Sequence, residues 1–129
     1  MPEAAKLTVI VVDDQKAMRS LVHSSLKEMG CHRVRECADG VEALRELHVS
    51  PCHLVISDLN MPRMDGLELL RSVRANAQIA KTAFILLTSR GEMDLVKQAV
   101  ALGVNNYIRK PFTMADLRRK IEAVVGPLT

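Results

Sequence analysis

Aromatic residues are scarce in this sequence, which has two phenylalanines, one tyrosine and no tryptophan among its 129 residues. Proteins that hold single-stranded nucleic acid stack its bases on aromatic side chains along a basic groove. Here the 18 lysines and arginines are spread along the chain, and the net charge is only +3. We therefore expect no nucleic-acid partner.

Long apolar runs are also absent. No segment approaches the roughly 20 apolar residues that a membrane-spanning helix requires. Residues 1–6 lack the charged region and the following apolar region of a secretory signal. These absences predict a cytoplasmic protein without a membrane segment.

Cysteine and histidine are few and scattered. The three cysteines, Cys31, Cys37 and Cys52, are an odd number without C-x-x-C spacing, and the four histidines do not stand at the intervals of a metal finger. Neither a disulfide framework nor a zinc site is supported by this pattern. The thiols are expected to be reduced.

The length and composition are those of one soluble domain, with 48% apolar and 26% charged residues among 129. No linker, internal repeat or low-complexity segment divides the chain. We therefore expect a single domain over residues 1–129, with its core at about residues 7–125. We also expect no effector domain after the last predicted helix, so that any output is protein binding.

Two hydrophobic periods alternate along the chain. Short apolar runs predict buried strands, and the segments between them carry apolar residues at helical spacing. The predicted strands are residues 7–12, a weaker one within 32–38, the run 54–56 with Asp58 at its C-terminal end, 83–88 and 106–109. The helices between them end near Gly30, Pro51, Asn76 and Gly103, and Thr113 is the predicted N-cap of the last helix. Five strands alternating with five helices predict an α/β three-layer sandwich around a parallel sheet.

Polar residues stand at the carboxyl ends of four of the predicted strands, namely Asp13 with Asp14, then Asp58, Thr88 and Lys110. Each has an ordinary explanation by itself, as a helix N-terminus, a turn aspartate, a strand-end hydroxyl or a solvated lysine. The carboxyl ends of parallel strands meet at one edge of the sheet, however, where such folds bind ligands. We therefore expect these side chains to converge on one site.

The chemistry of this set is that of phosphoryl transfer. Crowded carboxylates repel one another and favour binding of a hard cation, and Mg²⁺ fits a site that offers few protein carboxylates and accepts phosphate oxygens. Asp58 can act as a nucleophile toward a phosphoryl group. Lys110 and the Thr88 hydroxyl can then bind the phosphoryl oxygens. Pro111 ends the last strand, and a cis bond before it is one conformation open to the chain.

Four motifs carry a resemblance to a known family: Val11–Asp14, Ser57–Gly66, Leu87–Ser89 and Lys110–Thr113. In this order they resemble the receiver domains of bacterial two-component response regulators, and most closely the single-domain chemotaxis regulators of the CheY type. The resemblance covers about residues 7–125. It implies a flavodoxin-like fold with five parallel strands in the order 2-1-3-4-5.

The resemblance also implies roles for individual residues. Asp58 matches the phosphoacceptor, Lys110 the phosphate-binding lysine and Thr88 the switch hydroxyl. Tyr107 matches the aromatic residue whose inward or outward rotamer reports the active state, and a half-buried strand tyrosine without that role is the alternative. The Mg²⁺ ligands implied are the carboxylates of Asp13, Asp14 and Asp58 and the backbone carbonyl of Asn60.

As a family member, the protein is expected to be a monomeric signalling switch rather than a classical enzyme. A CheA-type histidine kinase would donate the phosphoryl group, and the target would be a flagellar motor switch protein or another protein. A phosphate sink that drains the kinase needs the same site and stays an alternative. Gln15, Ser89 and Arg90 depart from the best-known chemotaxis member, so the phosphoryl lifetime does not transfer.

Two other classes of protein share part of this pattern. Haloacid-dehalogenase-like phosphatases place a second aspartate two residues after the nucleophile as general acid, and here that position is Asn60, which cannot serve. A flavin-binding flavodoxin-like protein would need a phosphate loop rich in Ser, Thr or Gly after the first strand. Residues 13–17 contain none of these three residue types.

Overall fold

A computed structural model describes residues 3–129 as a five-stranded parallel sheet in the order β2-β1-β3-β4-β5, which is the order implied by the family resemblance. The strands are β1 (Thr8–Val12), β2 (Arg33–Cys37), β3 (Leu54–Asp58), β4 (Ala83–Thr88) and β5 (Asn106–Arg109). The helices are α1 (Lys16–Glu28), α2 (Gly40–Val49), α3 (Gly66–Ala75), α4 (Met93–Ala101) and α5 (Met114–Val125), preceded by a 3₁₀ turn, η1 (Ala4–Lys6).

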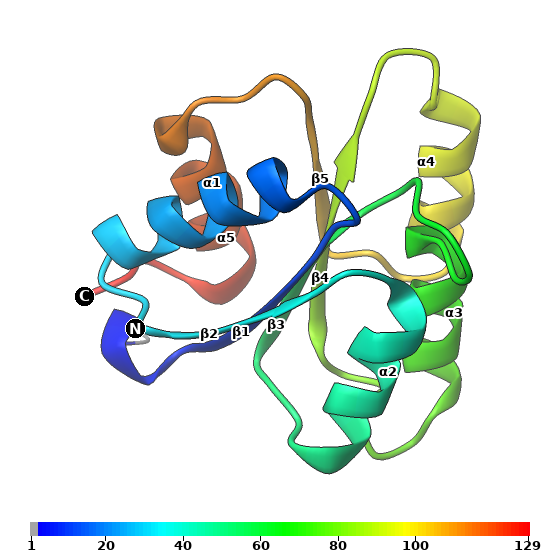
Figure 1. The fold of residues 1–129 in the computed structure, drawn as a ribbon, viewed down its shortest axis with the longest axis horizontal. Coiled ribbons are helices and arrows are strands. Elements are labelled where there is room, and N and C mark those ends of the chain that lie inside the picture. The colour runs from blue at the N-terminus through cyan, green and yellow to red at the C-terminus, as the bar shows by residue number, and fades with distance from the viewer. Residues whose placement is uncertain (1–2) are drawn as a thin grey trace.

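The helices cover both faces of the sheet, with α1 and α5 on one side and α2, α3 and α4 on the other (Figure 1). Successive side chains of a strand point to opposite faces, and each face has its own core. In β1, Val9 and Val11 pack in the first core, while Ile10 and Val12 pack in the second. The three-layer α/β sandwich predicted from the sequence is therefore confirmed.

The boundaries differ from the sequence predictions only at the ends of elements. β1 begins one residue after Leu7, and β2 is confined to the middle of the predicted segment. The short turn η1 was not predicted. Met1 and Pro2, which begin the segment predicted to lack a secretory signal, lie outside the described residues.

Reciprocal capping boxes set the start of two helices near the functional edge. The Thr113 hydroxyl accepts a hydrogen bond from Asp116 N at 3.0 Å, and the Asp116 side chain accepts one from Thr113 N, also at 3.0 Å. Asp65 and Glu68 form the same reciprocal pair at the start of α3. Such capping boxes satisfy N–H groups that a helix leaves unpaired. The predicted N-cap at Thr113 is confirmed.

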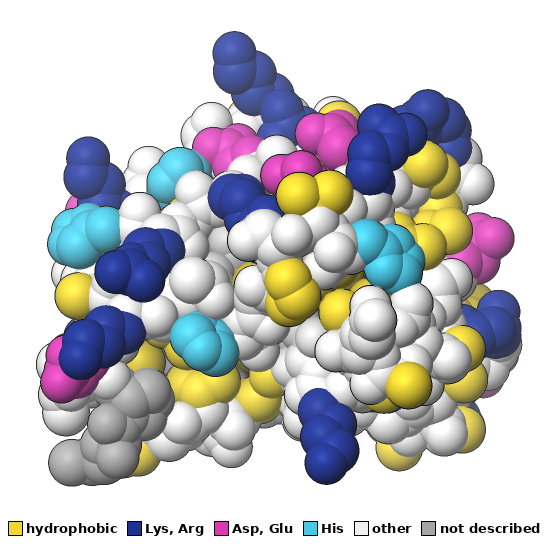
Figure 2. Space-filling view, turned by 90° about the horizontal axis from the view of Figure 1, so that it is seen from below, with side chains coloured by type: hydrophobic (Ala, Val, Ile, Leu, Met, Phe, Trp, Pro, Cys, Tyr) yellow, Lys and Arg dark blue, Asp and Glu magenta, His cyan; other side chains and the backbone are white. Residues whose placement is uncertain are grey.

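Figure 2 shows the end opposite to the strands' carboxyl edge, where lysine and arginine side chains are distributed around the face and do not gather at its centre.

None of the helices described for residues 3–129 is long and apolar enough to cross a membrane.

Candidate functional site

Asp58 is the last residue of β3, at the carboxyl edge of the sheet. It pairs in register with Leu87 of β4, and Leu59 N donates to Leu87 O at 3.1 Å, so the backbone of β4 holds it in place. The start of α3 packs closely below it. A Cβ atom added at Gly66 would lie 2.3 Å from Asp58 O, so the tight turn between β3 and α3 depends on glycine.

The three predicted carboxylates converge. Asp13, Asp14 and Asp58 each offer an oxygen within 4.8 Å of the others. Asp13 is fully buried and Asp58 nearly so, whereas Asp14 is exposed. Asp13 Oδ1 accepts a hydrogen bond from Gln15 N at 2.9 Å, but Asp13 Oδ2 accepts none.

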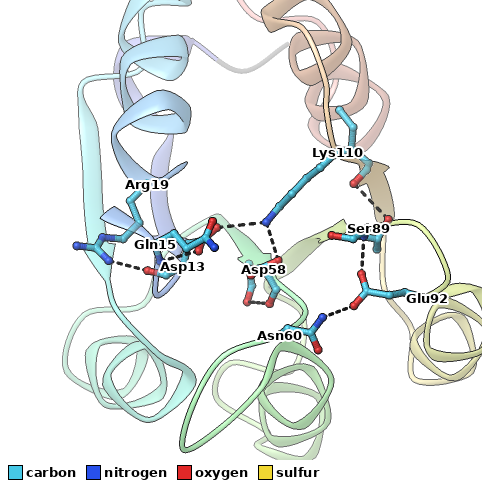
Figure 3. Close-up of polar contacts among 11 residues, drawn as sticks. Asp13, Gln15, Arg19, Asp58, Asn60, Ser89, Glu92 and Lys110 are labelled. Atoms are coloured by element: carbon cyan, nitrogen blue, oxygen red, sulfur yellow. Dashed lines mark hydrogen bonds and ion pairs between the residues drawn. The ribbon is translucent and has the colours of Figure 1, made fainter. Parts of the chain in front are cut away.

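Lys110 is the cation of this cluster (Figure 3). Its Nζ atom donates to Asp58 Oδ1 at 3.0 Å and lies 3.7 Å from Asp13 Oδ2. The backbone of Lys110 is fixed to the end of β4, because its N–H donates to Thr88 O at 2.8 Å. The Lys110–Pro111 bond is cis, one of the conformations left open by the sequence.

Burial dominates the electrostatics of the cluster. It raises the pKa of both Asp13 and Asp58, and the nearby Asp14 carboxylate raises these pKa values further. Lys110 lowers both pKa values, and the Gln15 N–H lowers that of Asp13. One ammonium group thus offsets only part of the charge of three carboxylates.

The cluster fits a magnesium ion. Its donors are carboxylate oxygens, which Mg²⁺ prefers, and a buried oxygen of Asp13 has no hydrogen-bond donor. A hard cation at these oxygens would relieve their mutual repulsion. Asn60, expected to add its backbone carbonyl, lies two residues beyond Asp58, in the loop that follows β3.

Thr88 and Tyr107, the expected switch pair, lie on neighbouring strands. Thr88 is buried, and its hydroxyl donates to Ile108 O over a long 3.5 Å. Tyr107 is partly exposed, and Lys120 Nζ lies 5.4 Å from the centre of its ring. Both residues line a hollow of about 110 Å³ beside the β4–α4 loop. The structure thus places them beside one small space next to the site.

Two interactions of the site were not predicted from the sequence. Glu92 accepts hydrogen bonds from the Asn60 side chain and from Ser89 N, and so joins the loops that follow β3 and β4 (Figure 3). Arg63 has φ 66° and forms a 2.8 Å ion pair with Asp39, which holds the β3–α3 loop against α2. The contacts of Asn60 with Glu92 and of Arg63 with Asp39 join residues 32 and 24 positions apart, and no local pattern marks them.

Comparisons with known proteins agree with this geometry. Residues 9–122 match the family model of the response regulator receiver domain. The chain is 43% identical over 128 residues to a Rhizobium etli protein named "Probable chemotaxis protein CheY", covering 99% of each chain. It is 38% identical to chemotaxis protein CheY1 of Helicobacter pylori, covering 93% of this chain and 98% of the relative.

Solved structures are similar over the same length. Chemotaxis protein CheY4 of Vibrio cholerae has a TM-score of 0.84 at 31% identity, covering 92% of this chain and 98% of that chain. The receiver domain of a sensor histidine kinase from Pseudomonas aeruginosa, with a magnesium ion in its active site cleft, has a TM-score of 0.84 at 26% identity, covering 93% and 98%. By sequence and by fold, this chain belongs to the response regulator receiver domain family of two-component systems.

Proposed function

We propose that this protein is a phosphorylation-controlled response regulator in which Asp58 accepts a phosphoryl group from a histidine kinase. The observation that carries the proposal is the position of Lys110, whose ammonium group lies between the carboxylates of Asp58 and Asp13. An Asp58 oxygen attacks phosphorus, the bond from phosphorus to the kinase's histidine nitrogen breaks, and that nitrogen keeps the electron pair and is protonated. The product is an aspartyl-phosphate on Asp58.

The side chains around Asp58 have distinct tasks in this proposal. Lys110 faces the added negative charge, and the Thr88 hydroxyl donates to a phosphoryl oxygen. Asp13, Asp14, Asp58 and the Asn60 carbonyl would hold Mg²⁺, which supplies positive charge against the phosphoryl oxygens. This is self-modification of a switch, and no other substrate is turned over.

Thr88 and Tyr107 are the proposed elements that pass the signal outward. A phosphoryl group can shift the protein between two states only through its different interactions with them. Because both residues line the same hollow, a movement of Thr88 toward Asp58 would leave room for Tyr107 to turn inward. The surface between them, including α4, would then change its affinity for a protein target.

The cellular role proposed is chemotaxis, supported by relatives named as chemotaxis proteins at 43% and 38% identity. The donor would be a CheA-type kinase, and the target a flagellar motor switch protein or another protein. Draining phosphoryl groups from the kinase as a sink is the alternative role. We propose that residues 1–129 act in the cytoplasm as one monomeric receiver domain.

Acetyl phosphate labelling tests the chemistry. With Mg²⁺, the wild-type protein should acquire one hydroxylamine-labile phosphoryl group, and Asp58→Asn should acquire none because an amide is not a competent nucleophile. The matched control is Asp94→Asn, an exposed residue of α4, which should label like the wild type. Labelling of Asp58→Asn would place the phosphoacceptor elsewhere.

Capture with beryllofluoride, a stable mimic of the aspartyl-phosphate, tests the role. A motor switch protein retained only in its presence would support motor control. Retention of the kinase alone would favour the sink.

A further inference from the structure

Glu92 connects the two loops that border the site. One carboxylate oxygen accepts a hydrogen bond from the Asn60 side-chain amide, and the other accepts one from Ser89 N (Figure 3). Asn60 follows Asp58 by two residues, and Ser89 comes directly after Thr88 at the end of β4. A single side chain therefore ties the loop after β3 to the loop after β4.

This carboxylate does not serve its own helix. Glu92 occupies the N-cap position of α4, where an acidic side chain ordinarily accepts hydrogen bonds from the first turn. Here it makes no such bond. Its hydrogen bonds go instead to Asn60 and to Ser89, which precedes the helix. The Glu92 side chain therefore connects the two loops at the border of the site and makes no capping hydrogen bond to α4.

The donors that Glu92 occupies flank the place where new negative charge would form. Asp58 and Leu87 are paired in register, so Ser89 lies two residues beyond the level of Asp58 on the adjoining strand. A phosphoryl group on Asp58 needs N–H and O–H donors for its oxygens. The Thr88 hydroxyl can become such a donor by losing only its long 3.5 Å hydrogen bond to Ile108 O. The Ser89 N–H, in contrast, already donates to the Glu92 carboxylate.

We propose that Glu92 is an internal anion that latches the β4–α4 loop in the unphosphorylated state. This inference rests on the proposed function of Asp58 as phosphoacceptor. A phosphoryl group would compete with the Glu92 carboxylate for the Ser89 N–H and repel its charge, so phosphorylation releases the latch. The released loop has space to move into, since Ser89 and Glu92 line the same hollow as Thr88 and Tyr107.

The latch opposes activation, so removing it should favour the active state. A contact made only in the inactive state lowers apparent affinity for any ligand that selects the active state. Hydrogen bonds to a charged group that are partly exposed to water suggest an effect of roughly three- to tenfold. Glu92→Ala should therefore bind beryllofluoride more tightly than the wild type by about that factor.

Titration of beryllofluoride with saturating Mg²⁺, followed by calorimetry and by amide NMR, tests the latch. Glu92→Ala should bind three- to tenfold more tightly, and its Tyr107 amide resonance before addition should be shifted toward the wild-type complex. Glu92→Gln, which loses the charge but keeps an acceptor, should be intermediate. Asp94→Ala removes an exposed acidic side chain from the same end of α4 and should match the wild type.

The outcomes separate the latch from the function on which it rests. Equal or weaker beryllofluoride binding by Glu92→Ala, with normal binding by the wild type, would overturn the latch alone. Tighter binding by Asp94→Ala to the same degree would reduce the effect to general charge and also overturn it. If the wild type bound no beryllofluoride, the proposed function itself would fail.

Discussion

Lys110 Nζ lies 3.0 Å from Asp58 Oδ1 and 3.7 Å from Asp13 Oδ2, so one ammonium group serves two buried carboxylates. Breaking a buried ion pair by removing one partner leaves an uncompensated charge. Removal of a carboxylate should therefore reduce the repulsion between the remaining carboxylates, whereas removal of the lysine should increase it. Variants of the carboxylates and of the lysine can therefore distinguish effects on metal binding, on stability and on signalling.

Asp14→Ala should weaken Mg²⁺ binding by about tenfold or more, because it removes one of the few charged oxygen ligands that the ion would use. Asp14 is exposed, so its loss should leave the fold intact. Amide NMR titration with Mg²⁺ measures the change, with Asp94→Ala as the control. An unaltered titration would contradict the assignment of Asp14 as a ligand.

Asp13→Asn should stabilise the metal-free protein at neutral pH by on the order of 1 kcal/mol. Burial, and then Asp58, raise the pKa of Asp13 above its ordinary value of 3.8. A carboxyl whose pKa is raised by folding stabilises the fold when protonated, and this contribution is lost as the pH rises through the raised pKa. The advantage of Asn should therefore be complete at neutral pH and shrink as the pH falls toward 3.8.

Urea unfolding in the presence of EDTA, at neutral and at acidic pH, measures this difference. Added Mg²⁺ should then stabilise the wild type more than Asp13→Asn, because only the wild type keeps every proposed ligand. A destabilised Asp13→Asn at neutral pH would mean that the ion pair with Lys110 outweighs the cost of burial.

The strands that hold the site were predictable because their signals are local. The predicted strands at residues 83–88 and 106–109 agree with β4 and β5, since each is an apolar or β-rich run bounded by turn or helix signals. Asp58 and Lys110 converge as expected, because parallel strands bring their carboxyl ends to one edge. The N-cap at Thr113 needed only its own side chain and the pattern that followed.

The contacts across loops were not predictable in this way. Glu92 and Asn60 are 32 residues apart, and their contact depends on how two loops pack after the sheet has formed. The left-handed conformation of Arg63 and its ion pair with Asp39 depend likewise on the position of α2. The hydrophobic pattern of the sequence predicts which residues lie at the carboxyl edge of the sheet, but not which polar groups their side chains contact there.

Gly66→Ala should destabilise the protein by about 1–3 kcal/mol or more and weaken Mg²⁺ binding, because the new Cβ requires movement of neighbouring atoms. It would lie 2.3 Å from Asp58 O and 2.9 Å from Leu86 Cδ2. Urea unfolding and Mg²⁺ titration measure the two effects. Gly103→Ala is the comparison: its Cβ meets only Arg74, at 3.4 Å, so it should destabilise through its φ of 87° and leave Mg²⁺ affinity unchanged.

Lys110→Ala should separate phosphorylation from signalling. This variant retains the nucleophilic oxygen of Asp58 and all the proposed Mg²⁺ ligands, so labelling by acetyl phosphate should slow but persist. The active state, however, is favoured only if the phosphoryl group interacts with it differently from the inactive state. Without Lys110, part of that difference is lost, and phosphorylation should shift the population far less.

Thr88→Ala should behave similarly, because its hydroxyl is the second proposed partner of the phosphoryl group. The measurement is affinity for the target captured with beryllofluoride, for wild type, Lys110→Ala and Thr88→Ala at matched phosphorylation levels. Lys81→Ala, which removes an exposed lysine just before β4 at the opposite end of the sheet, should retain wild-type affinity. Equal affinity in all four proteins would show that Lys110 and Thr88 do not couple the phosphoryl group to the binding surface.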